Sequence, residues 1–179
     1  MSFAQITRFA RRRLRISAMS LGVFALAGCS SPDTTGEVPG VDAPSAPERE
    51  VRITLESYYD AFSARDWPRF ETHFWDGATM TTVWMPPGES AERVVATSIP
   101  EFVAQAPMGP GSREIFEERL VSARIVVEGD DLAQAQVNYH ARFGDPGEVM
   151  EWEGVDAFTL LKYGGEWRIS SLAYMPDSN

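Results

Sequence analysis

The residues best suited to chemistry in this sequence are an aspartate and a tyrosine that lie far apart along the chain. Asp156 begins a run of strand-forming residues on the side that otherwise reads as core, followed at alternate positions by Phe158 and Leu160. An unpaired carboxylate on a core face is costly, so the pattern predicts a hydrogen-bonding partner for Asp156. Tyr58, on the apolar stripe of a predicted helix, is the candidate partner. The pair could contact a ligand or could brace the helix against the sheet, and the sequence leaves both open.

His73 and His140 are candidates for proton transfer, because histidine titrates near neutral pH. His73 falls on a predicted second helix, and His140 shares the polar face of its strand with Gln136, Asn138 and Arg142. A metal site needs three or four converging ligands, and two distant histidines without a spaced carboxylate motif do not supply one. We therefore expect no metal and no cofactor. The sequence also contains no glycine-rich phosphate loop, GxSxG, HExxH or CxxC motif.

The element that positions Asp156 is a predicted hairpin over residues 155–175. Gly164 and Gly165 separate two runs of strand-forming residues, which is a strong signal for a two-residue turn. The register set by this turn pairs Leu160 with Ile169, Phe158 with Ser171, and Asp156 with Ala173.

The rest of the domain reads as helices first and strands afterwards. Ser45 and Glu48 form a capping box before a helix with one apolar stripe, and Asp66 caps a second, short helix. Strands are predicted over 79–84, 93–97, 115–128, 132–143 and from 152 into the terminal hairpin, with a short helix over 99–105. Clean alternation in 132–143 is typical of an antiparallel sheet with one covered face. The fold class is therefore α+β.

The N-terminal 28 residues read as an export signal. They hold five arginines and no acid, and the apolar stretch 16–28 is shorter than the roughly 20 residues of a membrane-spanning helix. The stretch ends in Leu26-Ala27-Gly28-Cys29, which resembles the bacterial lipoprotein box. This resemblance implies cleavage before Cys29 and its acylation, for example with palmitate. Ser30 after the cysteine, by resemblance to enterobacterial sorting rules, favours the outer membrane facing the periplasm. A plain secretory peptide with an incidental cysteine is the alternative.

Composition divides the remainder into a tether and one domain. Residues 29–47 are rich in Ser, Pro, Gly, Asp and Thr and cannot bury enough apolar surface to fold, so they are predicted to be a flexible tether. Residues 48–176 are long enough for a single domain with a real core. The first 28 residues hold five of the 16 basic residues and none of the 26 acidic ones, which leaves the rest with a formal charge of −15. Nucleic acid is therefore not an expected partner.

Three segments carry a resemblance to a known family: YYDAFSARDWPRFETHF (58–74), LAQAQV (132–137) and FTLLKYGGEWRISSLAY (158–174). Together they resemble the NTF2-like superfamily, whose fold is a cone-shaped (cystatin-like) α+β barrel with N-terminal helices packed on a curved antiparallel sheet. The chain is most similar to its SnoaL-like and lumazine-binding-type bacterial domains, over about residues 48–176. The resemblance is informative about fold and says little about activity, because this fold hosts enzymes and binding modules alike.

The resemblance also suggests roles for the candidate residues. In ketosteroid isomerase, a member of this fold, a tyrosine and a protonated aspartate stabilise an oxyanion while a second aspartate moves the proton. Tyr58 and Asp156 fall at the first two positions, but the position of the base falls at about Thr82, whose hydroxyl is too weak a base. An isomerase of that type is therefore not expected. Scytalone dehydratase uses histidines with an aspartate and tyrosines, which keeps His73 and His140 as candidates.

The expected function is that of a lipid-anchored envelope domain that binds a small apolar molecule or a partner protein without catalysis. One alternative is an enzyme of the isomerase, dehydratase or cyclase type, and another is a dimer-forming module, since the outer face of the sheet is a common dimer surface in this superfamily. An open cavity at Tyr58 and Asp156 would favour binding or catalysis, and a filled cone would favour a structural role. The expected pocket lies between the helices and the concave face of the sheet and is lined by Tyr58, Tyr59, Phe62, Phe74, Trp84, Phe158, Leu160 and Tyr174.

Overall fold

The computed structural model describes residues 43–84 and 90–176, so the predicted signal segment, Cys29 and nearly all of the tether lie outside the described residues. Helix α1 begins at Ala46. The helices are α1 (Ala46–Ser63), α2 (Trp67–Thr72) and α3 (Ile99–Gln105), followed by the short 3-10 turns η2 (Ala106–Met108) and η3 (Pro110–Ser112). The strands are β1 (Phe74–Trp84), β2 (Arg93–Ser98), β3 (Ile115–Glu128), β4 (Leu132–Asp145), β5 (Glu148–Tyr163) and β6 (Glu166–Pro176).

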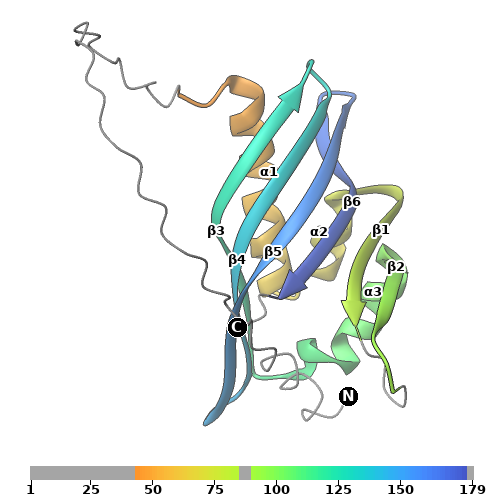
Figure 1. Ribbon diagram of the computed structural model, residues 1–179, viewed down its shortest axis with the longest axis vertical. Helices are drawn as coiled ribbons and strands as arrows, with labels where there is room; N and C mark the ends of the chain where they lie inside the picture. Colours follow the sequence, from red (N-terminus) through yellow and green to blue (C-terminus); the bar gives the residue numbers. More distant parts are fainter. Residues whose placement is uncertain (1–42, 85–89, 177–179) are drawn as a thin grey trace, which may run out of the picture.

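The strands form one curved sheet in the order β2-β1-β6-β5-β4-β3. Every neighbouring pair is antiparallel except β1 and β6, which run parallel. Helices α1 and α2 lie against one face of this sheet, and α3 lies near β1 and β2 at its other edge (Figure 1). Helices followed by a curved, mostly antiparallel sheet confirm the predicted α+β class.

Both N-terminal helices begin where the sequence predicts. Ser45 and Glu48 form the reciprocal capping box of α1, and Asp66 accepts a hydrogen bond from the Arg69 N–H at the start of α2. The predicted second helix, however, ends before Phe74, which is already the first residue of β1. The strand therefore starts five residues before the expected 79, with a break in its pairing to β6 between Phe74 and Thr79. Gly77, with a φ of 81°, lies in this irregular stretch and hides the alternation.

The long central strands follow the predicted alternation. On β4 the buried side chains are Ala133, Ala135, Val137, Tyr139, Ala141 and Phe143. Strand β5, however, begins at Glu148 rather than near 152, because β4 continues to Asp145 and a tight turn at Pro146 and Gly147 joins the two strands. Pro146 and Gly147, the glycine with a positive φ, suit such a turn. Few apolar residues flank the turn, so the ends of the two strands are not marked by an apolar pattern.

The register of the terminal hairpin differs from the expectation over half its length. Leu160 pairs with Ile169 as predicted, but an irregularity between Thr159 and Leu160 shifts the remaining pairs by one residue. Phe158 therefore pairs with Leu172, and Asp156 with Tyr174. The shift places Leu172 inside the core and Ala173 outside, the reverse of the predicted faces.

The space between α1 and the sheet is filled largely by aromatic rings. Phe62 packs against Trp67, Phe70, Phe102 and Phe116, with ring centroids 4.8 to 6.2 Å apart. These rings come from both N-terminal helices, α3 and β3. They join the helical layer to the edge of the sheet in one continuous core. No helix in the described part of the chain is long and apolar enough to span a membrane.

Candidate functional site

Asp156 lies on the inner face of β5 with Phe158 two residues further on. The sheet register places Val137 of β4 on one side of it and Tyr174 of β6 on the other. Only 2% of Asp156 is exposed. A carboxyl group held this deeply by three central strands cannot rely on water for its hydrogen bonds.

The hydroxyl of Tyr59 donates a hydrogen bond to Oδ2 of Asp156 at 2.5 Å. The partner that the structure supplies is thus one residue along α1 from the expected Tyr58. Successive helical residues point about 100° apart, so two neighbouring tyrosines on a buried face meet different parts of the sheet. The bond joins α1 to the centre of the sheet across 97 residues of sequence.

Tyr58 belongs to the aromatic core. It is 1% exposed, and its ring lies 5.0 Å from that of Tyr59, 5.3 Å from Phe70 and 5.4 Å from Phe158. Burial, with a further effect of the charge on Asp156, raises the pKa of the Tyr58 hydroxyl. The predicted cavity between Tyr58 and the sheet is therefore occupied by side chains at this end of the cone.

Glu118 supplies a second carboxyl group on the inner side of the sheet. It follows the buried Phe116 by two residues on β3 and pairs with the buried Ala141 on β4. The hydroxyl of Ser63, the last residue of α1, donates to the Glu118 carbonyl at 2.7 Å and accepts from its N–H at 2.8 Å. The end of α1 therefore fixes the backbone from which this carboxyl group projects.

The two carboxyl groups influence each other's ionisation. Burial raises the pKa of Asp156 to about 7, against the opposing effect of the hydrogen bond from Tyr59. Burial and then the charge of Asp156 raise the pKa of Glu118 well above its usual range. A proton bound to one carboxyl group therefore affects the other, and the two titrate as a pair. Such a pair can donate as well as accept hydrogen bonds near neutral pH.

Three further aromatic residues complete the surroundings of the carboxyl groups. Tyr139 is buried on β4, whereas Trp152 of β5 and Tyr174 of β6 are half-buried. A Cβ atom at Gly154 would lie 2.3 Å from the Tyr139 hydroxyl, so the glycine leaves room for this ring over the strand. Burial, followed by the charges of Glu118 and Asp156, raises the pKa of Tyr174 to about 12.

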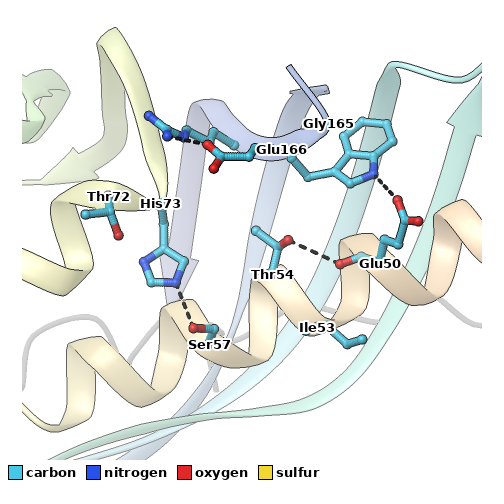
Figure 2. Close-up of a pocket in the computed structure, with 10 residues that line it drawn as sticks. Glu50, Ile53, Thr54, Ser57, Thr72, His73, Gly165 and Glu166 are labelled. Carbon is cyan, nitrogen blue, oxygen red and sulfur yellow. Dashed lines mark hydrogen bonds and ion pairs between the residues drawn. The ribbon is translucent and has the colours of Figure 1, made fainter. Parts of the chain in front are cut away.

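The two best-defined cavities among the described residues do not include Asp156 or Glu118. The larger, of about 470 Å³, lies outside the cone between α1, the end of α2 and the start of β6 (Figure 2). The smaller, of about 230 Å³, lies between α1 and β3. In the described part of the chain, no three His, Cys, Asp or Glu residues are grouped so that they could hold a metal ion.

Neither histidine joins the carboxyl pair. His73 follows the last residue of α2, is 8% exposed and has Nε2 2.9 Å from the Ser57 hydroxyl. His140 alternates with the buried residues of β4 and therefore lies on the outer face of the sheet, with Nε2 3.9 Å from a carboxylate oxygen of Glu151. The structure thus separates the two candidate bases from Asp156.

The remaining predicted pocket residues divide into two groups. Phe62, Phe74, Phe158 and Leu160 are buried in the core. Trp84 and Tyr174 are half-buried. Of these two, Tyr174 is the cross-strand neighbour of Asp156, so one partly accessible ring lies beside the buried carboxyl group.

Sequence reasoning missed Glu118 and Tyr139 as members of the acid–tyrosine cluster, which we define as Tyr59, Glu118, Tyr139, Asp156 and Tyr174. Glu118 stands among other charged residues, which suggests a solvated strand face. Its alternation with Phe116 and Leu120 is the signal that could have found it, since all three positions share one face.

The comparisons with known proteins support the fold and do not extend to a function. No protein-family model matches the sequence, and a comparison with curated proteins finds no match. The chain resembles several solved structures at low identity. A candidate scytalone dehydratase from Novosphingobium aromaticivorans has a TM-score of 0.57 at 12% identity, over 72% of this chain and 83% of that one.

Two other solved structures give the same picture. A candidate dehydratase of the NTF2-like family from Streptomyces avermitilis has a TM-score of 0.56 at 15% identity. The match covers 72% of this chain and 94% of the dehydratase chain. An NTF2-like protein of unknown function from Pseudomonas putida has a TM-score of 0.57 at 18% identity, over 72% and 85% of the two chains. The described domain therefore has the NTF2-like α+β cone fold.

Proposed function

We propose that this protein is a lipid-anchored envelope protein whose NTF2-like domain binds a small, largely apolar molecule through the acid–tyrosine cluster. The ligand would present an oxygen to Asp156 and its neighbours and rest its apolar part on the half-buried rings of Trp152 and Tyr174. Small-molecule sites are commonly of this kind, largely apolar with a few polar groups that fix orientation.

The observation that carries the proposal is the placement of two carboxyl groups on the inner side of the sheet, with Asp156 buried and Glu118 half-buried. Burial raises the pKa of both Asp156 and Glu118, so keeping them ionised at neutral pH costs stability. An apolar pair of similar volume would avoid this cost. Perturbed acids inside a fold are typical of functional sites, where stability is given up for recognition or chemistry.

Neither cavity is lined by Asp156, and a filled cone favours a structural role, so ligand binding at the cluster requires the rings beside Asp156 to move apart. Trp84, Trp152 and Tyr174 are half-buried, whereas Tyr58, Phe158 and Leu160 on the other side are 0–2% exposed. A ligand that enters there would reach Tyr174, the cross-strand neighbour of Asp156, without displacing the Tyr58 core.

A second candidate function, an enzyme of the isomerase, dehydratase or cyclase type, is favoured by Glu118. The expected base position, Thr82, uses its hydroxyl to donate to the Tyr174 carbonyl at 2.8 Å, and it has no carboxylate. Glu118 could instead carry the proton while Asp156 polarises a carbonyl group, since their ionisation is linked.

The lipid anchor rests on Cys29, the one cysteine of the chain, at the end of the box Leu26-Ala27-Gly28-Cys29. An acylated Cys29 and the tether after it would hold the domain close to a membrane surface. A domain so placed would meet apolar molecules that partition into lipid.

The test is native mass spectrometry of the full chain, extracted in mild detergent from its own membranes. We expect a non-covalent small molecule on the wild type that is lost from the double variant Tyr59→Phe/Asp156→Leu. The same variant should melt at a higher temperature at pH 8, because it removes a buried ionisable group. A wild type without any bound molecule, or a variant that retains it at the same occupancy, would overturn the proposal.

The variant Glu118→Gln separates binding from catalysis. A binding protein would carry the same molecule with or without this change. An enzyme would carry a different one, because substrate would accumulate where proton transfer is blocked. The comparison needs only the mass of the bound molecule in the two proteins.

A further inference from the structure

The larger cavity contains a serine and a histidine in an arrangement that the proposed ligand site does not use. The cavity has a volume of about 470 Å³, within the range of small-molecule sites. Figure 2 shows Ser57 on α1 pointing toward His73, with Glu50 at the opposite end. Trp167, whose indole donates to Glu50, also lines the cavity. Ser57 is half-buried and lines the cavity, so a bound molecule could reach its hydroxyl.

The surroundings of His73 fix which of its nitrogens carries hydrogen. Nδ1 lies 2.9 Å from the carbonyl oxygen of Arg69 and 3.3 Å from that of Phe70. Carbonyl oxygens only accept hydrogen bonds, so Nδ1 must be the protonated nitrogen. Nε2 of the neutral ring then has a free lone pair, which faces the Ser57 hydroxyl at 2.9 Å. The histidine is thus oriented as a base toward the serine.

Arg69 acts on the same hydroxyl from the other side. Its Nη2 atom donates to Oγ of Ser57 at 2.8 Å, and the residue is exposed at the surface. Ser57 therefore accepts from a guanidinium group and donates to an imidazole. Both contacts make the hydroxyl proton easier to remove. Burial lowers the pKa of His73 against the opposing effect of the hydrogen bonds to the Phe70 and Arg69 carbonyls, and the charge of Arg69 adds a smaller lowering, so the ring is neutral and able to accept a proton at pH 7.

We propose that Ser57 is the nucleophile of a second site that transfers acyl groups from small uncharged esters, with His73 as its general base. Oγ of Ser57 attacks the ester carbonyl carbon while its proton passes to Nε2 of His73. The tetrahedral intermediate then expels the alcohol, which takes the proton from His73. Water, deprotonated by the same nitrogen, releases the carboxylic acid and restores Ser57.

Arg69 donates to the attacking oxygen itself, so its guanidinium stabilises the negative charge that develops on Oγ of Ser57 as the proton leaves. The preference for an uncharged ester follows from the cavity walls. The Glu50 carboxylate accepts hydrogen bonds from Lys162 at 2.5 Å and from the Trp167 indole at 3.1 Å, and Glu166 is paired with Arg168. These charges are compensated, and Ile53 adds apolar surface.

A serine-directed fluorophosphonate is the probe for this site, applied to the purified full chain and followed by peptide mass spectrometry. We expect the label on Ser57, none in Ser57→Ala, and about a 100-fold slower labelling in His73→Gln. Arg69→Gln, at an exposed position that tolerates change, should slow labelling without a large change in melting temperature. Ser122→Ala is the matched control, an exposed serine that should not alter the rate.

The pH dependence gives a second readout. Charged groups around His73 are Arg69 on α2, Glu50 on α1, and Glu166 and Arg168 on β6. The labelling rate should be constant above neutral pH and fall in acid, with a midpoint below the ordinary 6.5 of histidine. Absence of label on Ser57 in folded protein, or an unchanged rate in both His73→Gln and Arg69→Gln, would overturn the proposal. Either result leaves the acid–tyrosine cluster unaffected.

Discussion

Asp156 makes the stability of the domain depend on pH in a direction opposite to that of an ordinary surface carboxylate. Its pKa is about 7 in the folded protein and about 3.9 in an unfolded chain. The protonated form is therefore favoured by folding. The stability this contributes is fully present below about pH 4 and is lost as pH rises through 7.

The variant Asp156→Asn removes the titration of Asp156 and its effect on Glu118, so the difference between the two proteins reports the ionisation of the pair. We expect the free energy of unfolding of the wild type, relative to Asp156→Asn, to fall between pH 4 and pH 7.5 by at most about 4 kcal/mol. Glu50 and His73, whose pKa values are lowered, oppose this trend in both proteins and cancel in the difference. Urea unfolding of both proteins at several pH values measures the difference in their free energies of unfolding. A difference that does not vary with pH would contradict the prediction.

The two neighbouring tyrosines of α1 should differ sharply when their hydroxyl groups are removed. Tyr59→Phe deletes the bond to Asp156 and should destabilise the domain by about 1–3 kcal/mol. It should also raise the pKa of Asp156 further, because the Tyr59 bond lowers it. Tyr58→Phe is the matched control and should change that pKa less. NMR titration of the Asp156 carboxyl carbon measures this pKa in the wild type and the two variants. Equal changes of the pKa in Tyr59→Phe and Tyr58→Phe would argue against the hydrogen bond between Tyr59 and Asp156.

For single residues, the sequence predicted correctly that Asp156 is buried and hydrogen-bonded, but the predicted partner, Tyr58, was wrong. Tyr58 and Tyr59 both belong to the apolar stripe of α1, and the stripe alone does not say which one reaches β5. That depends on how the helix is rotated against the sheet, which the tertiary packing sets. Glu118 was missed for a related reason, since its face is set by the pairing of β3 with β4.

Among the secondary-structure elements, the close contact between β4 and β5 at Gly154 makes the sharpest prediction. A Cβ atom there would lie 2.3 Å from the Tyr139 hydroxyl and 2.6 Å from the Met175 carbonyl oxygen. Gly154→Ala should therefore destabilise the domain by about 1–3 kcal/mol, because the ring must move within a packed core. Thermal unfolding with fitted enthalpy measures the change.

The same substitution in a Tyr139→Leu background is the control. The shorter side chain removes the clash with the ring, so the added cost of Gly154→Ala should be smaller there. Equal costs in the two backgrounds would place the strain on the backbone of β6 rather than on Tyr139.

The predicted elements differ in how closely their bounds match the structure. Helix α3, which begins after a capping serine, has the predicted bounds, and so does strand β3 despite an irregular pairing between Leu120 and Ser122. Two of the differences fall at irregularities, the pairing break in β1 after Phe74 and the shift in β6 opposite Thr159, and a third falls at the tight turn between β4 and β5. A bulge adds one residue without changing composition, so the sequence pattern does not show it.

For the whole molecule, the proposed lipid anchor would determine where the domain works. The described domain accounts for the fold, while the predicted acylated Cys29 lies outside the described residues. Each buried methylene of an acyl chain contributes about 0.8 kcal/mol to membrane binding, so several chains on one cysteine would hold the protein firmly. The domain itself, with its excess of acidic residues, has no comparable attraction to an anionic surface.

We therefore predict that Cys29→Ser moves the protein from the membrane to the soluble fraction of the envelope. Without the thiol the chain cannot be acylated, and the segment before residue 29 would remain uncleaved or be cut at another site. Membrane fractionation with an alkaline wash, together with the intact mass after feeding a labelled palmitate, measures both effects. Ser30→Ala is the control that should remain anchored, and Ser30→Asp should shift the protein toward the inner membrane if the enterobacterial sorting rule applies. Retention in the washed membrane of Cys29→Ser molecules whose intact mass shows that the N-terminal segment has been removed would show that the domain binds membranes without the lipid.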